Sequence, residues 1–255
     1  MPTDHTPLDD QEQPFITHLV ELRDRLLKAA VMVLLVFIAL SFIANDLYSQ
    51  LAGPLLKQMP AGSQMVAIDV ASPFLAPFKL ALVAAIFITV PFSLYQLWAF
   101  VAPGLYLHEK KMLLPLLVSS TALFYAGMAF AYYVVFPLMF AFLTATVPAG
   151  VTMMTDISKY MDFVLTLFFA FGVSFEVPIV ALLLVWSGLV SAKGLAEKRS
   201  YVIVAAFIIG AVLTPPDVVS QTLLAVPIWL LFELGVLAAR WIPERKEDHF
   251  PSTDT

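Results

Sequence analysis

The feature that most constrains this chain is a succession of long apolar runs that are almost free of charged residues. A transmembrane helix needs about 20 mostly apolar residues, and six stretches approach or reach that length. The six are Ala29–Asn45, Leu80–Leu107, Leu113–Pro137, Phe163–Ala192, Tyr201–Leu213 and Val218–Ala239. After Pro137, a tail rich in Ala, Thr, Pro and Gly indicates a loop. The pattern predicts an all-α integral membrane bundle of six transmembrane helices.

Composition excludes the main soluble classes. Hydrophobic residues make up 60% of the chain and charged residues 13%, against about 45–50% and about 25% in ordinary globular domains. A soluble enzyme or a disordered protein does not fit these values. The absence of cysteine excludes a disulfide framework. The net charge of −5 argues against nucleic acid as a partner, because nucleic-acid binding calls for a basic face.

The last two spans are expected to be short. Leu213 is followed by Thr214-Pro215-Pro216-Asp217, and two prolines cannot continue a helix interior. The fifth span is then about 20 Å long at 1.5 Å per residue, against a bilayer core of about 30 Å. Either the bilayer thins there or the hairpin is only partly inserted.

Lysine and arginine set the orientation. Six spans put both termini on one side, and eleven of the fourteen basic residues fall on that side. The other side holds Lys57, Lys79 and Lys159. The basic side faces the cytoplasm, so both termini are predicted inside. Residues 1–13 and 243–255 are predicted to be flexible tails around a membrane domain at 14–242.

The stretch Pro14–Lys28 is typical of an amphipathic helix with an apolar stripe at helical spacing. Glu21 and Arg25, and likewise Asp24 and Lys28, are four residues apart in the favourable order. The simpler interpretation is an interfacial helix with surface ion pairs. The alternative is that Glu21 offers its carboxylate to a partner.

Glu109 is an acid on a mostly basic face. Lys110 or Lys111 could neutralise it. Together with Glu21 it could instead bind a cation with planar donors, for which arginine is the natural guest. The nearby Trp98 and Tyr106 are better explained as interfacial anchors.

Glu176 lies near the middle of the fourth span. A charge there costs at least about 2.5–3.5 kcal/mol, so such a residue is a functional candidate. The alternative is a neutral carboxyl that forms a hydrogen bond with a neighbouring helix. Pro178 indicates a kink close by.

The final hairpin carries several polar residues. Asp217 could cap the sixth span, while Thr214, Gln221 and Glu233 could form a polar cluster that contacts a helix of this chain or of another. The segment Asp46–Phe78 is predicted to be an external cap with short helices.

Catalytic and metal-binding motifs are absent. None of His5, His18, His108 and His249 lies in a span, and there is no H-E-x-x-H, G-x-S-x-G or P-loop pattern. We therefore expect no enzyme activity, no metal and no cofactor.

Several motifs resemble those of the TatC family, the multi-span subunit of the twin-arginine protein translocase. The stretch His18-Leu19-Val20-Glu21-Leu22-Arg23-Asp24-Arg25-Leu26 matches its amino-terminal signature. Further matches are Asp69–Phe74, Tyr95–Leu105, Phe171–Pro178 and Leu213–Asp217. The resemblance extends from about residue 18 to about residue 235.

The resemblance implies a receptor for folded proteins whose signal peptides carry two adjacent arginines. It implies a bacterial cytoplasmic (inner) membrane, the proton-motive force as energy source, and an oligomeric complex with TatA-like and TatB-like single-span partners. Glu21 and Glu109 would be the carboxylates for the arginine pair, with Phe100 in the same patch and Arg23 shaping it.

The resemblance assigns further roles across the membrane domain. Glu176 would be the intramembrane acid of the family. Asp217 and Pro54 would be external-side positions linked to transport. Thr214, Gln221 and Glu233 would lie on the hairpin that contacts partner helices.

An alternative function is a proton-coupled small-solute transporter that uses Glu176 and Glu233. Such a transporter would be expected to show inverted repeats around a midplane site. The sequence shows no internal repeat, and the alternative leaves Glu21 and Glu109 without a role.

Overall fold

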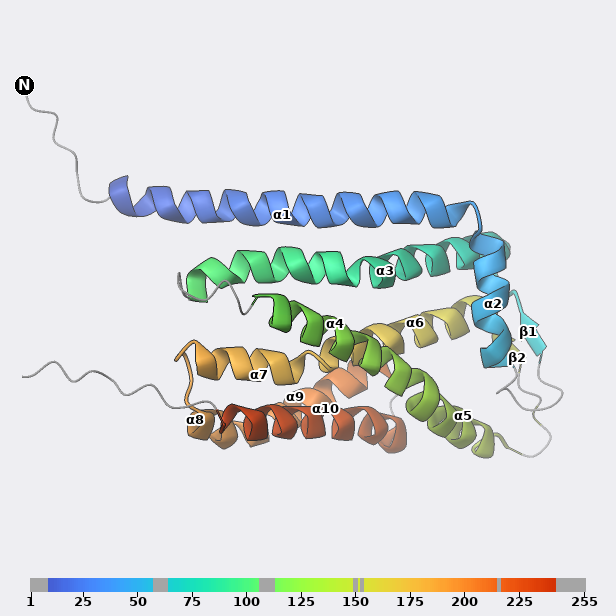
Figure 1. Ribbon diagram of the computed structural model, residues 1–255. Coiled ribbons are helices and arrows are strands. Elements are labelled where there is room, and N and C mark those ends of the chain that lie inside the picture. Colours follow the sequence, from blue (N-terminus) through green and yellow to red (C-terminus); the bar gives the residue numbers. More distant parts are fainter. Residues whose placement is uncertain are drawn as a thin grey trace, which may run out of the picture. The chain divides into compact units, whose positions relative to one another are not determined.

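The computed structural model describes residues 9–56, 64–105, 113–148, 151, 154–214 and 217–241. Helices dominate this part of the chain (Figure 1). They are α1 (Asp9–Ser41), α2 (Ala44–Leu56), α3 (Ser72–Leu105), α4 (Leu113–Phe130), α5 (Phe136–Ala145), α6 (Ile157–Ser174), α7 (Val177–Trp186), α8 (Ala192–Glu197), α9 (Arg199–Leu213) and α10 (Val218–Ala239), with a π-helical turn at Ala131–Val135 and two strands, β1 (Gln64–Val66) and β2 (Met154–Asp156).

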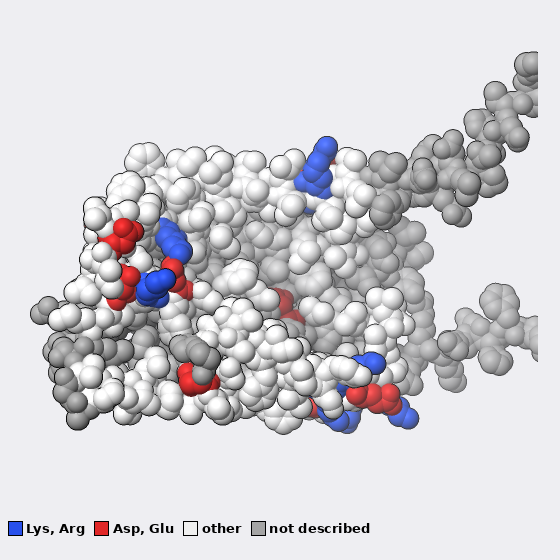
Figure 2. Space-filling model, turned by 180° about the vertical axis from the view of Figure 1, so that it is seen from behind, with Lys and Arg blue, Asp and Glu red and all other residues white. Residues whose placement is uncertain are grey.

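The apolar helices confirm the predicted membrane bundle. Four helical stretches are long and apolar enough to cross a bilayer: Ser72–Val101, Leu114–Ala145, Ile157–Trp186 and Val218–Ala239. A fifth segment is the pair α1 and α2, bent by 83° at their junction, and α9 is a shorter apolar helix. These segments correspond to the six predicted spans. Figure 2 shows a largely white face on which the few charged side chains gather in small groups.

The chain divides into two compact units. The first comprises residues 1–122 and 140–166, and the second comprises residues 123–139 and 167–255. In the first unit, α1 and α3 pack side by side and α2 packs against α3 (Figure 1). In the second unit, α10 packs against α7 and α9.

The N-terminal parts of α3 and α6 pack together in the first unit. Leu80 of α3 packs with Met161 and Leu165 of α6 in a buried cluster. Ser158 donates a hydrogen bond of 2.9 Å to Ser72, and Lys79 forms an ion pair with Asp162. Next to these contacts, β1 pairs in parallel with β2. The segment predicted as an external cap, Asp46–Phe78, thus contains most of α2 and all of β1. Its last residues, from Ser72 onward, form the first turns of α3.

The sequence predicts a loop directly after Pro137, which is wrong for residues 138–145, and the non-helical backbone begins only at Thr146. The helix continues through the π-helical turn and α5 as far as Ala145. The physical reason lies just before Pro137, which is the second residue of α5. The π-helical turn before Pro137 re-pairs the backbone, with the N–H of Phe136 donating to the carbonyl of Ala131, so the helix runs past a proline in its interior.

Two further differences concern the lengths of helices. The amphipathic stretch Pro14–Lys28 and the first span form one continuous helix of 33 residues, α1. The final pair was expected to be short, which holds for α9 with 15 residues but not for α10 with 22. α10 continues past Pro227 because burial of residues such as Leu224, Ile228 and Leu231 stabilises it on both sides of the proline.

Candidate functional site

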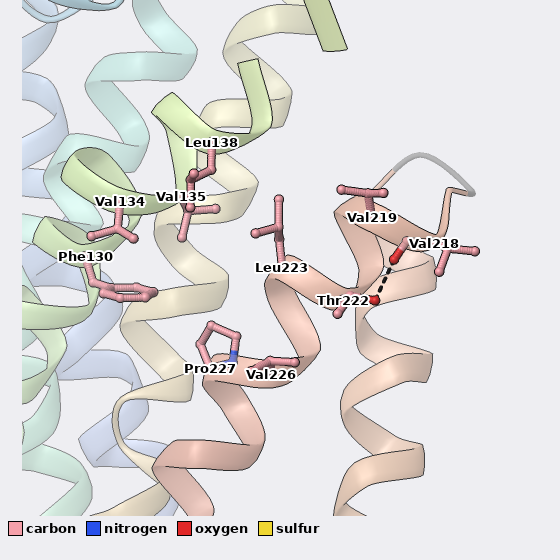
Figure 3. Close-up of a pocket in the computed structure, with 10 residues that line it drawn as sticks. All are labelled: Phe130, Val134, Val135, Leu138, Val218, Val219, Thr222, Leu223, Val226 and Pro227. Carbon is pink, nitrogen blue, oxygen red and sulfur yellow. Dashed lines mark hydrogen bonds between the residues drawn. The ribbon is translucent and has the colours of Figure 1, made fainter. Parts of the chain in front are cut away.

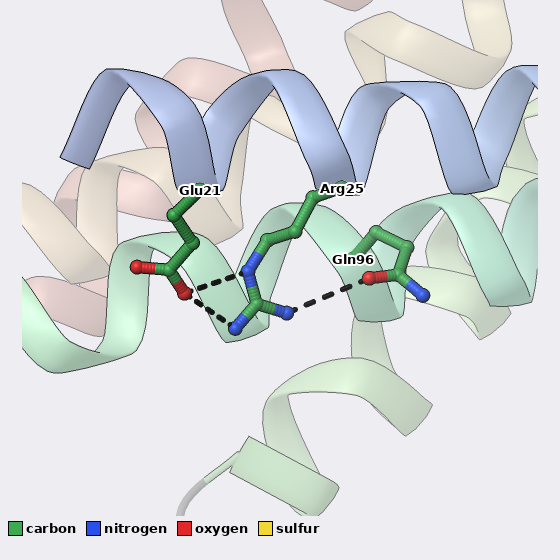
Figure 4. Close-up of polar contacts among 3 residues, drawn as sticks. All are labelled: Glu21, Arg25 and Gln96. Atoms are coloured by element: carbon green, nitrogen blue, oxygen red, sulfur yellow. Dashed lines mark hydrogen bonds and ion pairs between the residues drawn. The ribbon is translucent and has the colours of Figure 1, made fainter. Parts of the chain in front are cut away.

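Glu21 and Arg25 lie one turn apart on α1 and form the ion pair that their spacing predicted (Figure 4). Nε and Nη2 of Arg25 both donate to Oε1 of Glu21, at 2.9 and 2.7 Å. The third contact comes from α3, where Oε1 of the buried Gln96 accepts from Nη1 of Arg25 at 3.5 Å. Glu21 therefore already binds a guanidinium group.

Arg23 projects from α1 to solvent, with 66% of its side chain exposed. It donates to Oδ1 of Asp24 through Nε at 3.0 Å and through Nη2 at 2.8 Å. The predicted pair of Asp24 with Lys28 is thus replaced by a pair of Asp24 with Arg23. A guanidinium presents two N–H groups side by side, which favours it over an ammonium at an exposed carboxylate.

Phe100, near the end of α3, stacks on His18 of α1. The ring centroids are 4.2 Å apart and the planes are tilted by only 17°. The same two helices therefore hold the Glu21–Arg25–Gln96 contacts and this ring pair. Glu109 lies outside the described residues, and so does the side chain of Pro54, whose backbone belongs to α2.

Helical spacing could have identified His18 and Gln96 beforehand. His18 precedes Glu21 by three residues and Arg25 by seven, so the three share one face of α1. Gln96 precedes Phe100 by four residues on α3. The missing information was that these two faces meet, which only the packing of α1 on α3 supplies.

Glu176 lies at the break between α6 and α7 in the second unit. Both carboxylate oxygens are buried. Its backbone N–H donates to Val173 at 3.0 Å, whereas Pro178 has no N–H to offer the carbonyl of Ser174. The helix is interrupted just before Pro178, and this break places an acid inside an apolar helical stretch of 30 residues.

A glycine brings α10 against this break. A Cβ atom at Gly235 would lie 2.9 Å from the Cβ of Ala181 and 2.9 Å from the Cα of Pro178. Such distances are too short for any side chain. The close approach of α10 to α7 therefore depends on glycine at this position.

The polar residues of the final hairpin do not form one cluster. Asp217 caps α10 as predicted, accepting from the backbone N–H of Ser220 at 2.7 Å. Thr214 is buried and donates to the carbonyl of Gly210 at 2.8 Å, and Gln221 lies in the first turn of α10 after the cap. Glu233 lies about three turns further along α10, where it binds Arg199.

An apolar pocket of about 460 Å³ lies in the second unit (Figure 3). Phe130, Val135 and Leu138 form one wall, and Leu223 and Pro227 of α10 belong to the other. The hydroxyl of Thr222 donates to the carbonyl of Val218 at 2.6 Å, so this polar group is already satisfied within the helix. The pocket offers little to a hydrophilic solute.

No group of three or more His, Cys, Asp or Glu side chains gathers in the described part of the chain. Nothing among these residues resembles the donor set of a metal centre. The chemistry available is therefore that of carboxylates, guanidinium groups and aromatic rings at the α1–α3 pair, and of a buried acid at the α6–α7 break.

Comparison with known proteins gives one consistent family. The family model "Sec-independent protein translocase protein (TatC)" matches residues 17–227. TatC of Haemophilus influenzae is 59% identical over 239 residues, covering 94% of this chain and 93% of the relative. TatC of Escherichia coli strain K12 is 55% identical over 232 residues, covering 91% and 90%.

A solved structure shares the fold. The crystal structure described as twin arginine translocase receptor TatC has a TM-score of 0.80 and 37% sequence identity, and the match covers 88% of this chain and 98% of that one. The predicted resemblance is therefore confirmed by sequence and by structure. The chain belongs to the TatC family of Sec-independent protein translocase proteins.

Proposed function

We propose that this chain is the receptor for twin-arginine signal peptides and the core subunit of a translocase that exports folded proteins across the bacterial cytoplasmic membrane, driven by the proton-motive force. The single observation that carries the receptor role is the state of Glu21, which binds the guanidinium of Arg25 through two N–H donors. A site that binds one guanidinium has the chemistry to bind another.

Two adjacent arginines call for two acceptors, and Glu109 is the proposed second one. Phe100 supports recognition because an aromatic face can stack on a planar guanidinium, and its ring is already held in place by His18. The exposed Arg23 limits where a cationic peptide approaches, which is how it would shape the site.

The receptor role is tested by binding of a twin-arginine signal peptide to the full chain in nanodiscs. We expect Glu21→Gln and Glu109→Gln each to weaken binding at least tenfold, since a charge-assisted pair is replaced by a neutral contact. Glu197→Gln, which removes an exposed acid at the end of α8, is the matched control. Unchanged binding by both site variants would refute the receptor role.

Glu176 is proposed to act in transport after recognition. Its oxygens are buried at a helix break, and an ionisable residue inside a membrane span is a functional candidate because a charge there is costly. We expect Glu176→Gln to bind the signal peptide normally and to export little folded reporter. If Glu176→Gln lost peptide binding while keeping its fold, this assignment would be wrong. Asp217 and Pro54 are proposed to serve transport from the external side.

The hairpin of α9 and α10 is proposed to contact TatA-like and TatB-like single-span partners within an oligomeric complex. Thr214 and Gln221 flank its turn, and Glu233 lies further along α10. Both termini are proposed to face the cytoplasm. Crosslinking from Gln221 to a co-expressed single-span partner tests the contact, with an exposed position outside the hairpin, Leu34 of α1, as control.

The structure gives no support to the transporter alternative. That function needs Glu233 to exchange protons, but its two carboxylate oxygens accept hydrogen bonds from Nε and Nη2 of Arg199. The pocket beside α10 is almost entirely apolar. Uptake of a small solute by the purified chain in liposomes would nevertheless revive it.

A further inference from the structure

The receptor site proposed above is already occupied by a residue of the chain. Both hydrogen bonds to the Glu21 carboxylate in the described structure come from Arg25, and both arrive at Oε1 (Figure 4). The Arg25 side chain is 24% exposed and that of Glu21 is 39% exposed. The pair is thus accessible from outside, and the guanidinium is the more sheltered partner.

Arg25 and an arginine of a signal peptide would compete for the same carboxylate. A guanidinium binds a carboxylate best when two parallel N–H groups meet the two oxygens. Arg25 holds Oε1 with two donors, which leaves only Oε2 for an incoming group. A full two-oxygen contact by the peptide therefore requires Arg25 to withdraw.

Gln96 gives Arg25 a place to withdraw to. Its amide oxygen lies 3.5 Å from Nη1 of Arg25, at the long limit of a hydrogen bond. Gln96 is buried on α3, so its amide cannot be satisfied by bulk water as easily as a surface group. A small movement of the guanidinium toward α3 would shorten this contact while releasing Glu21.

We propose that Arg25 is an internal competitor for the twin-arginine site and that Gln96 is the acceptor that receives it when a signal peptide binds. This proposal rests on the proposed receptor function. Displacement sets a threshold that favours arginine over lysine, because an ammonium lacks the planar pair of donors that could hold both oxygens of Glu21 once Arg25 has left Oε1. Arg25 and Gln96 act as specificity-determining residues.

The test is the affinity of twin-arginine and twin-lysine signal peptides for the full chain in nanodiscs. We expect Arg25→Gln to raise the affinity for the twin-arginine peptide about two- to fivefold, the range of a surface ion pair. The same variant should show a smaller preference for the twin-arginine peptide over the twin-lysine peptide. We expect Gln96→Leu to lower the affinity for the twin-arginine peptide, since Arg25 then loses its alternative hydrogen-bond acceptor. These opposite signs would not arise from general loosening of the α1–α3 pair.

A control separates competition from net charge. Lys28→Gln removes the same charge two turns from Glu21 on the same helix, but makes no contact with Glu21 in the structure. An equal gain in affinity for the twin-arginine peptide in Lys28→Gln and in Arg25→Gln would overturn the proposal. So would an Arg25→Gln variant whose binding is unchanged or weaker.

The double variant Arg25→Gln/Gln96→Leu tests whether the two residues act together. If Gln96 acts only through Arg25, the effect of Gln96→Leu vanishes once Arg25 is gone. An undiminished effect would overturn the role of Gln96. The result for Glu21→Gln is interpreted separately. Unchanged binding there would show that Glu21 is not an acceptor for the signal peptide, whereas weakened binding there with no gain in affinity for Arg25→Gln would refute only the competition.

Discussion

Arg199 and Glu233 form a two-point ion pair in the second unit, with Nε 2.5 Å from Oε1 and Nη2 2.8 Å from Oε2. The pair joins the first residue of α9 to the C-terminal third of α10. It therefore fixes one end of a hairpin whose two helices are joined at the other end by residues 214–217. Partner contacts on this hairpin would depend on that geometry.

Breaking this pair should loosen the hairpin. We expect Arg199→Ala and Glu233→Ala each to lower the temperature of heat-induced aggregation in detergent, because each leaves a charge without its counterpart. Exchange of the two residues, Arg199→Glu with Glu233→Arg, should restore part of the loss. Lys193→Ala, at an exposed position of α8, is the control. Equal stability of all these variants would contradict a structural role for the pair.

The cap of α10 can be separated from the charge of Asp217. We expect Asp217→Ala to destabilise the helix start by about 1 kcal/mol, because the N–H of Ser220 loses its acceptor. Asp217→Asn keeps an acceptor oxygen and should retain most of that stability. If Asp217→Asn is stable but exports poorly, the carboxylate has a role beyond capping. If both variants are as stable as the parent, the cap is unimportant.

Close helix packing should make two glycines intolerant of alanine. A Cβ at Gly127 would overlap the carbonyl oxygen of Phe171, and one at Gly235 would overlap Pro178. We expect each alanine variant to lose about 1–3 kcal/mol of stability through overpacking, measured by thermal unfolding in detergent. Gly210→Ala should cost less, since its Cβ would lie 3.3 Å from the nearest atom. Reversal of this order would contradict the packing.

The ring stack can be tested from the side of His18. We expect His18→Ala to weaken signal-peptide binding a few-fold, because Phe100 loses a contact of the kind worth about 0.5–1.5 kcal/mol. His18→Phe preserves an aromatic partner and should bind normally. Weakened binding by His18→Phe as well would show that the imidazole matters for something other than stacking.

Local patterns in the sequence were sufficient for several of these features. The pair of Glu21 with Arg25 followed from helical spacing, the cap at Asp217 from its place after Pro216, and the kink from Pro178. Each is a relationship between neighbours along one helix, which a single sequence displays directly.

Relationships across the fold were not accessible in the same way. Gln96 meets Arg25 across 71 positions and Arg199 meets Glu233 across 34. The parallel pairing of β1 with β2 joins segments that are even farther apart along the chain than the first pair. Periodicity shows which face of a helix is apolar, but not which other helix lies against it.

The central claim is that Glu21 binds arginine of the signal peptide. Its most direct test is the dissociation constant of a twin-arginine peptide, with a twin-lysine peptide as reference, for the parent chain and for Glu21→Gln in nanodiscs. We expect the parent to prefer the twin-arginine peptide and Glu21→Gln to lose both the affinity and most of the preference. A Glu21→Gln variant that binds the twin-arginine peptide as tightly and as selectively as the parent would contradict the claim.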